Sequence, residues 1–230
     1  MQEVLDGDSL VVVLDDAETE IRLAGVNAPE RDECFHPEAT DRLGDLVAGG
    51  TVLVERIGVD QFDRVLARLW RDGDMLNLDM VSTGHAIAVT PEEGDLPGEL
   101  LLEAEEEAFA AGAGLWADDA CGAPEPIPLV TLEVVSDPAG PDDEALEGEI
   151  VAISSAVPLD LGGWTIRDES SAHRCLLPDR AVTGAETALT ITSADSCWAP
   201  GDSPVWNNAG DMALLVDEAG RVAARHRYRS

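Results

Sequence analysis

The pattern of the chain changes at residues 122–128 (GAPEPIP), where three prolines fall within seven residues. Proline fixes its own backbone dihedral and lacks an N–H group, so this stretch stiffens the chain and ends regular structure. Before it, helical and strand patterns alternate; after it, only short strands are expected. A chain of 230 residues has room for two domains. We expect one over residues 1–122, a linker at 123–128 and another over 129–230.

The first domain combines strands with helices. Residues 10–14 and 19–26 have the pattern of a hairpin closed by Asp15 and Asp16. Helices and strands are then expected in the order helix 37–48, strand 51–57, strand 65–70, helix 76–83 and helix 97–111. This order suggests an α+β domain, a five-stranded OB-like barrel with three helices, of the type that binds oligonucleotides.

The second domain shows no convincing helical periodicity. Short strands are expected at residues 129–135, 148–154, 163–167, 188–192 and 212–217, with turn residues between them. A loop is expected at residues 136–144 (SDPAGPDDE). Short strands at such intervals are typical of an all-β sandwich.

The charge is strongly negative, because 47 acidic residues face 14 basic ones, and every basic residue is Arg. Such a surface argues against non-specific binding of nucleic acid and suits a salt-rich setting. The arginines are unevenly spread, however, since seven of them lie between Arg22 and Arg71. This basic stretch is compatible with a local anion-binding site inside the acidic first domain.

Four cysteines divide evenly between the two domains, with Cys34 and Cys121 in the first and Cys175 and Cys197 in the second. An even number in each favours one disulfide per domain; buried free thiols are the alternative. Disulfides would place the protein outside the cytoplasm, extracellular or on the cell surface. No run approaches the ~20 apolar residues of a membrane span. No signal peptide is recognised, and because the chain starts almost inside its first strand we expect a trimmed N-terminus.

Four short segments acquire meaning when taken together: DGDS (residues 6–9), Arg22, NAPE (residues 27–30) and DQFDR (residues 60–64). Each alone is an ordinary turn, loop or surface arginine. A phosphodiesterase needs a hard cation held by oxygen ligands, a carboxylate beside the attacking water and guanidinium groups for the charge on phosphorus. The predicted hairpin brings the first three segments to one end of the barrel, and Arg64 can reach the same place.

In this order the segments resemble the thermonuclease family, which has the staphylococcal-nuclease-like fold. Further matching stretches are IRLAGVNAPE (residues 21–30), NLDMVSTGHA (residues 77–86) and GLW (residues 114–116). The resemblance covers nearly all of residues 3–121. It implies a Ca²⁺-dependent nuclease that hydrolyses phosphodiester bonds in DNA or RNA with low sequence specificity.

The resemblance also implies roles for individual residues. Asp8 and Asn27 would be side-chain ligands of calcium, and the Ala28 carbonyl would be a backbone ligand. Glu30 would activate the attacking water, while Arg22 and Arg64 would stabilise the five-coordinate phosphate of the transition state.

Two positions depart from the family pattern. Asn27 stands where the family has Asp, so one negative charge is lost and calcium is expected to bind more weakly. Asp63 stands where the family often has Gly, which places a carboxylate near a polyanion site. Neither change removes a catalytic group.

The second domain resembles the lamin-tail domain, an immunoglobulin-like sandwich. The matching stretches are LDLGGWTIRDES (residues 159–170), HRCLLP (residues 173–178) and PVWNNAGDMALLVDEAG (residues 204–220), with Trp164 and Trp206 expected in the core. The sequence does not indicate a partner for this domain, and a stabilising or spacing module is the alternative to a binding domain. The chain ends in a basic tail with Arg221, Arg225, Arg227 and Arg229. We expect a solvated terminus, with contact to phosphate as the alternative.

The sequence therefore favours a monomeric nuclease with an appended β-sandwich. Two alternatives stay open: a non-catalytic binding module on the same barrel, and a partner-binding lamin-tail domain beside a relic nuclease. The retention of Arg22, Glu30 and Arg64 favours activity. A zinc site is not expected, because Cys34 and His36 have no second pair at ligand spacing.

Overall fold

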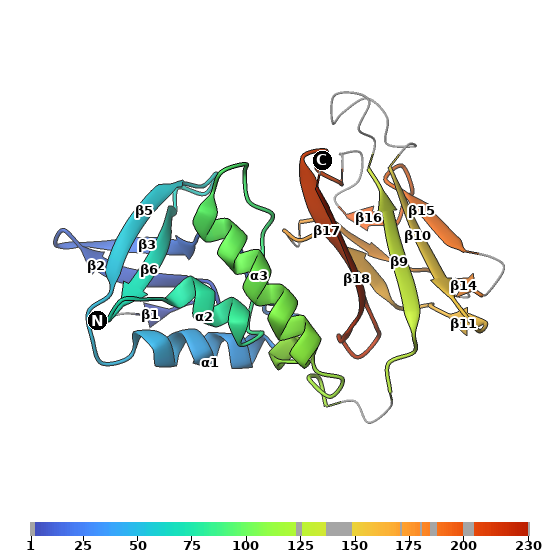
Figure 1. The fold of residues 1–230 in the computed structure, drawn as a ribbon, viewed down its shortest axis with the longest axis horizontal. Coiled ribbons are helices and arrows are strands. Elements are labelled where there is room, and N and C mark those ends of the chain that lie inside the picture. Colours follow the sequence, from blue (N-terminus) through green and yellow to red (C-terminus); the bar gives the residue numbers. More distant parts are fainter. Residues whose placement is uncertain are drawn as a thin grey trace. The chain divides into compact units, whose positions relative to one another are not determined.

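The computed structural model (Figure 1) describes residues 3–122, 126–136, 149–170, 172–179, 181–184, 188–199 and 205–229. The chain divides into two compact units, Met1–Cys121 and Gly122–Ser230, called here the first and second unit. No helix among the described residues is long and apolar enough to cross a membrane.

The first unit is built on a sheet with the strand order β1-β2-β3-β6-β5, and β7 also pairs with β6. Its strands are β1 (Glu3–Val4), β2 (Ser9–Leu14), β3 (Ala17–Leu23), β5 (Leu53–Val59), β6 (Val65–Arg71) and β7 (Asp74–Met75). A separate antiparallel pair joins β4 (Val26–Asn27) to β8 (Ile87–Ala88). Only β3 and β6 run parallel among the neighbours of the main sheet. The predicted hairpin is confirmed, and left-handed backbone at Asp15 and Asp16 closes it.

Three helices accompany this sheet, as predicted: α1 (His36–Val47), α2 (Leu76–Ser82) and α3 (Leu96–Ala111), and a 3-10 turn η1 (Gly114–Trp116) follows. Helix α1 buries Ala39, Leu43 and Val47, which lie on one face at a spacing of four residues. Helix α2 packs against α1, α3 and β6 (Figure 1). The apolar core of the unit lies between these helices and the sheet.

One predicted strand, residues 19–26, is wrong in its extent. Strand β3 ends at Leu23, and the chain turns at Gly25, whose φ is +75°. The Ala24 N–H donates to the Ala67 carbonyl, and Asn77 Nδ2 donates to the Ala24 carbonyl, so this turn is held from two sides. Asn27 therefore belongs to the separate strand β4 rather than to the loop after a long strand.

The described part of the second unit contains strands and no helix. One sheet has the order β15-β10-β9, a second has the order β16-β13-β12-β17-β18, and β11 pairs with β14. Their bounds are β9 (Val130–Val135), β10 (Ile150–Ser155), β11 (Leu159–Asp160), β12 (Thr165–Arg167), β13 (Arg174–Leu176), β14 (Val182–Thr183), β15 (Leu189–Thr192), β16 (Trp198–Ala199), β17 (Gly210–Val216) and β18 (Val222–Arg229). Trp164 and Trp206 are buried in the core as predicted, and Trp198 meets Trp206 edge to face. The predicted loop at residues 136–144 lies outside the described residues except for Ser136. Gly148, the first residue of the next predicted strand, also lies outside them.

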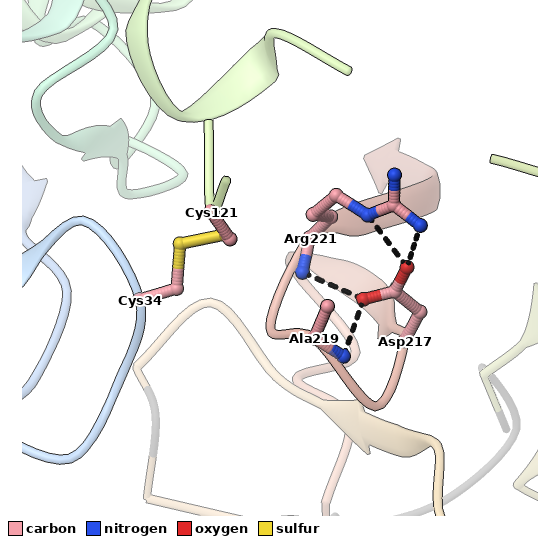
Figure 2. The surroundings of a disulfide bond; sticks show 5 residues. All are labelled: Cys34, Cys121, Asp217, Ala219 and Arg221. Atoms are coloured by element: carbon pink, nitrogen blue, oxygen red, sulfur yellow. Dashed lines mark hydrogen bonds and ion pairs between the residues drawn. A yellow bond between two sulfur atoms is a disulfide. The ribbon is translucent and has the colours of Figure 1, made fainter. Parts of the chain in front are cut away.

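Both predicted disulfides are present. Cys34 is joined to Cys121 (Figure 2) and Cys175 to Cys197, so none of the four cysteines is free. Each bond stays within one unit. The second bond ties β13 to the residue that precedes its neighbour β16.

The expectation of a solvated basic terminus is wrong. Residues 222–229 form β18, which pairs along its length with β17. Arg221 is buried, and its guanidinium and backbone N–H donate to the Asp217 carboxylate (Figure 2). Arg227 pairs with buried Glu169 at 2.7 Å. One local ion pair, Arg221 with Asp217, and one long-range ion pair, Arg227 with Glu169, therefore help to order this arginine-rich segment.

Asp211 at the start of β17 is fully buried beside Glu169. Burial, together with the charge of Glu169, raises the pKa of Asp211 to about 7, although N–H groups of Asn207 and Met212 oppose the shift. Folding thus favours the protonated acid. Its contribution to stability is fully present below the ordinary pKa of 3.8 and is lost as the pH rises through about 7.

We expect the urea concentration at the unfolding midpoint of the second unit to decrease as the pH is raised from 5 to 8, because Asp211 must ionise while buried. The midpoint is measured by fluorescence of the buried tryptophans. Asp211→Asn, which cannot ionise, should flatten this pH dependence even if it lowers stability at every pH. Asp179→Asn removes an exposed carboxylate and is the control. An equally steep pH dependence in Asp211→Asn would show that another group is responsible.

Candidate active site

The loop before β2 holds Asp8 below the surface, with 6% of the residue exposed. Asp6 accepts the Asp8 backbone N–H at 3.0 Å and closes the turn. A Cβ on Gly7 would come within 2.7 Å of the Cβ atoms of Ala28 and Ala39. Glycine at this position therefore lets the Asp8 loop pack tightly against the Ala28 segment and α1.

Arg22 projects from β3 and connects Asp8 with Asn27. Its Nη2 lies 3.0 Å from Asp8 Oδ2 and donates to Asn27 Oδ1 at 2.8 Å. Its Nη1 donates to the carbonyls of Leu23 and Val26 at 3.0 and 2.7 Å. The turn at the end of β3 thus fixes the guanidinium, and the oxygens of Asp8 and Asn27 converge on a single nitrogen.

Asp8 accepts two further hydrogen bonds. Its Oδ2 accepts the Ala28 backbone N–H at 2.7 Å, and its Oδ1 accepts the Ser9 hydroxyl at 2.9 Å. Burial raises the pKa of Asp8 to about 6, Arg22 opposes this shift, and the charge of Asp6 adds to it. A further positive charge beside Asp8 would therefore stabilise its ionised form.

Arg64 reaches the same place from the turn between β5 and β6. Its Nη1 donates to the Ser9 hydroxyl at 3.4 Å, and its Nε donates to Asp60 Oδ2 at 2.7 Å. Asp60 Oδ1 also accepts the backbone N–H groups of Phe62 and Arg64, both at 2.9 Å. Although desolvation raises the pKa of Asp60, the bonds from Arg64 and Phe62 together hold it below its ordinary value. Asp60 therefore stays ionised and orients the Arg64 guanidinium.

Glu30 lies two residues after Ala28 and is exposed. Its backbone N–H donates to Glu33 Oε2, and its carbonyl accepts the Glu33 N–H, both at 2.8 Å. The structure thus brings Asp8, Arg22, Asn27, Ala28 and Arg64 into one hydrogen-bonded group through Ser9. Glu30 stands on the adjoining loop outside that group.

The first unit is similar in sequence to known proteins. The sequence profile of the family described as "Staphylococcal nuclease homologue" matches residues 20–118. An "Uncharacterized endonuclease" of Escherichia coli is 34% identical over 116 residues, which is 50% of this chain and 74% of that protein.

The chain belongs to the staphylococcal nuclease homologue family.

Other relatives have similar overlap. An "Uncharacterized endonuclease" of Haemophilus influenzae is 35% identical over 118 residues, 51% of this chain and 65% of that protein. A "Micrococcal nuclease" of Shigella flexneri is 33% identical over 124 residues, 50% of this chain and 71% of that protein. The chain thus spans about two thirds to three quarters of these relatives. The family match confirms the predicted OB-type domain with three helices.

The staphylococcal nuclease homologue match starts at residue 20, so it includes Arg22, Asn27, Ala28, Glu30 and Arg64. Asp8 lies before the matched residues, and its ion pair with Arg22 connects Asp8 to the matched part. Two supporting residues of this domain, Asp60 and Ser9, were not predicted from the sequence. Asp60 could have been found from its place four residues before Arg64, because aspartate commonly caps such a turn.

The donors around Asp8 suit a hard cation. Asp8 and Asn27 offer a carboxylate and an amide oxygen within hydrogen-bond distance of the same Arg22 nitrogen. Calcium prefers carboxylate, amide and backbone oxygens. Among the described residues no group of three or more His, Cys, Asp or Glu side chains is placed to hold a metal. A calcium site here would therefore depend on the amide of Asn27 and on backbone oxygen as well as on Asp8.

Proposed function

We propose that the first unit is a calcium-dependent nuclease that hydrolyses phosphodiester bonds in DNA or RNA with low sequence specificity. The observation that carries the proposal is the group in which Arg22 joins Asp8 and Asn27, with Arg64 attached through Ser9. Relatives named endonuclease and micrococcal nuclease support the same activity.

In this proposal the two arginines bind the scissile phosphate. A guanidinium presents parallel N–H donors that match two phosphate oxygens, and its charge is most valuable when the phosphate becomes five-coordinate. Arg22 is held by two backbone carbonyls, and Arg64 is held by Asp60. Arg64 is therefore oriented before substrate arrives, whereas Arg22 would exchange Asp8 or Asn27 for phosphate oxygens or offer its Nε–H.

Glu30 is the proposed general base. Its exposed carboxylate can accept a proton from water on the open side of the site, while phosphorus is attacked in line and the sugar oxygen leaves. Asp8, Asn27 and the Ala28 carbonyl would hold calcium, which when bound supplies Lewis-acid polarisation of the phosphate.

The second unit is proposed to be a lamin-tail domain with an immunoglobulin-like sandwich over residues 129–230, joined by a linker at 123–128. Its two sheets and its buried tryptophans support this proposal. The disulfides in both units support an extracellular or cell-surface location. We propose a monomer in which the first unit, over residues 1–122, contains all the catalytic groups.

The direct test is cleavage of single-stranded DNA by the whole chain, with calcium or with chelator, from low to molar salt. Glu30→Gln should lower turnover by at least roughly a hundredfold, because an amide cannot accept the proton. Glu38→Gln, an exposed change on α1, is the matched control and should cleave normally. Turnover of Glu30→Gln close to the wild type would remove Glu30 from this role. A folded wild type that never cleaves would favour a non-catalytic binding module.

Asp60→Asn should lower turnover by about tenfold, because Arg64 loses the charged partner that fixes its orientation. The amide keeps one oxygen for the backbone N–H groups of Phe62 and Arg64, so the turn itself should persist. Asp63→Asn is the matched control, since it removes a neighbouring carboxylate from the same turn. Equal turnover in the two variants would show that Asp60 does not prepare Arg64.

Asn27→Asp should tighten calcium binding by about tenfold, roughly 1.4 kcal/mol, because a second carboxylate joins Asp8. The dissociation constant is measured by titration calorimetry on the whole chain. Thr51→Asp adds the same charge at an exposed position of the first unit and should leave it unchanged. Calcium affinity that stays constant or weakens in Asn27→Asp would argue against Asn27 as a ligand.

A further inference from the structure

The loop that carries Glu30 (residues 28–35, the Glu30 loop) connects β4 to α1. Its first residue is fixed, because the Ala28 N–H donates to buried Asp8. Its far end is fixed by His36, whose Nδ1 lies 3.0 Å from the Pro29 carbonyl oxygen, and by Phe35, whose ring lies 5.4 Å from that of His85. The two ends of the loop are therefore attached to the body of the unit.

The middle of the loop has a different support. Glu30 and Glu33 exchange two hydrogen bonds, but both residues belong to the loop. These two bonds shape the turn from within the loop. An exposed local pair of this kind also competes with water, so it contributes little to the rigidity of the loop.

Cys34 supplies a covalent attachment, four residues after Glu30. Its disulfide partner Cys121 follows η1 (Figure 2). This anchor is itself well held, because the Leu115 N–H donates to the Gly84 carbonyl at 2.8 Å and Trp116 packs edge to face on Phe109. The disulfide thus joins the exposed half of the Glu30 loop to the α3 end of the unit.

We propose that Cys34 and Cys121 are positioning residues for the reaction: their disulfide holds the Glu30 loop in place, and reducing it lowers turnover reversibly. The proposal rests on the proposed function, since Glu30 must be the base for its position to matter. A general base has to lie within hydrogen-bond reach of the water it activates, so a loosened loop reduces the rate of the chemical step. Calcium and phosphate affinity should change little, because Asp8, Asn27 and the arginines are held independently.

A small dithiol is the reductant that this response needs. One dithiol attacks the disulfide, transfers two electrons and two protons, and leaves as a cyclic disulfide, while Cys34 and Cys121 become thiols. Both cysteines are partly exposed, whereas Cys175 of the other disulfide is fully buried. Mild treatment should therefore open the Cys34–Cys121 bond first.

The test compares the wild type, Cys34→Ala/Cys121→Ala and Cys175→Ala/Cys197→Ala, each as the whole chain. Turnover and KM for single-stranded DNA are measured at saturating calcium, well below the melting temperature of every variant. We expect turnover to fall about tenfold in Cys34→Ala/Cys121→Ala, with KM and calcium affinity within about twofold of the wild type. The variant without the second disulfide should keep its turnover. General destabilisation would not produce this separation of turnover from KM.

Dithiothreitol treatment of the folded wild type is the second measurement, and its main result does not require the variant to fold. Turnover should fall by the same factor, recover on reoxidation, and remain unchanged when Cys34→Ala/Cys121→Ala is treated. Hydrogen exchange should rise in the amides of the Glu30 loop and stay constant in α3.

Each outcome has one meaning. Full turnover after loss of this disulfide, or exchange in the Glu30 loop that does not change, would overturn the positioning role alone. An oxidised wild type that cleaves no DNA would refute the proposed function, and the positioning role would fall with it.

Discussion

The site depends on the buried ion pair between Asp8 and Arg22. Removing two charges from water is costly, and a buried pair of this kind is often no better for stability than apolar residues of the same size. Here burial raises the pKa of Asp8 despite the adjacent guanidinium, so the cost is only partly offset. Such a pair is more easily understood as preparation for a charged ligand than as a device for stability.

The turn at the end of β3 makes this pair possible. Because Gly25 turns the chain, the carbonyls of Leu23 and Val26 face the guanidinium of Arg22, and Asn27 arrives in β4 on the other side. Strand β8 then pairs with β4, and its Ala88 N–H donates to Glu105, a buried residue of α3. The position of Asn27 is therefore determined by a helix almost eighty residues further along the chain.

This dependence explains which features the sequence could predict. The hairpin, the three helices and both disulfides follow from local periodicity, turn residues and the number of cysteines in each half. Strands β4 and β8 have two residues each, which is too short for any periodic signal. Strand β18 was missed for another reason. Its arginines have the composition of a solvated tail, and the sequence alone does not show that Arg227 pairs with Glu169. The residue types of the site could be predicted from the sequence, whereas the convergence of Asp8 and Asn27 on one nitrogen required the tertiary contacts.

The acidic surface repels nucleic acid, whereas the arginines of the site attract its phosphates. A chain with a formal net charge of −33 repels a polyanion over distances of about 10 Å at 0.1 M salt. Within the first unit, Arg22, Arg42, Arg56, Arg64 and Arg68 all pair with carboxylates, so most of its positive charge is neutralised locally. A nucleic acid would meet net repulsion until its phosphates competed with the carboxylate partners of Arg22 and Arg64. Salt weakens the long-range repulsion more than contacts inside a partly buried site. High ionic strength would therefore reduce the repulsion by the acidic surface more than it weakens contacts at this site.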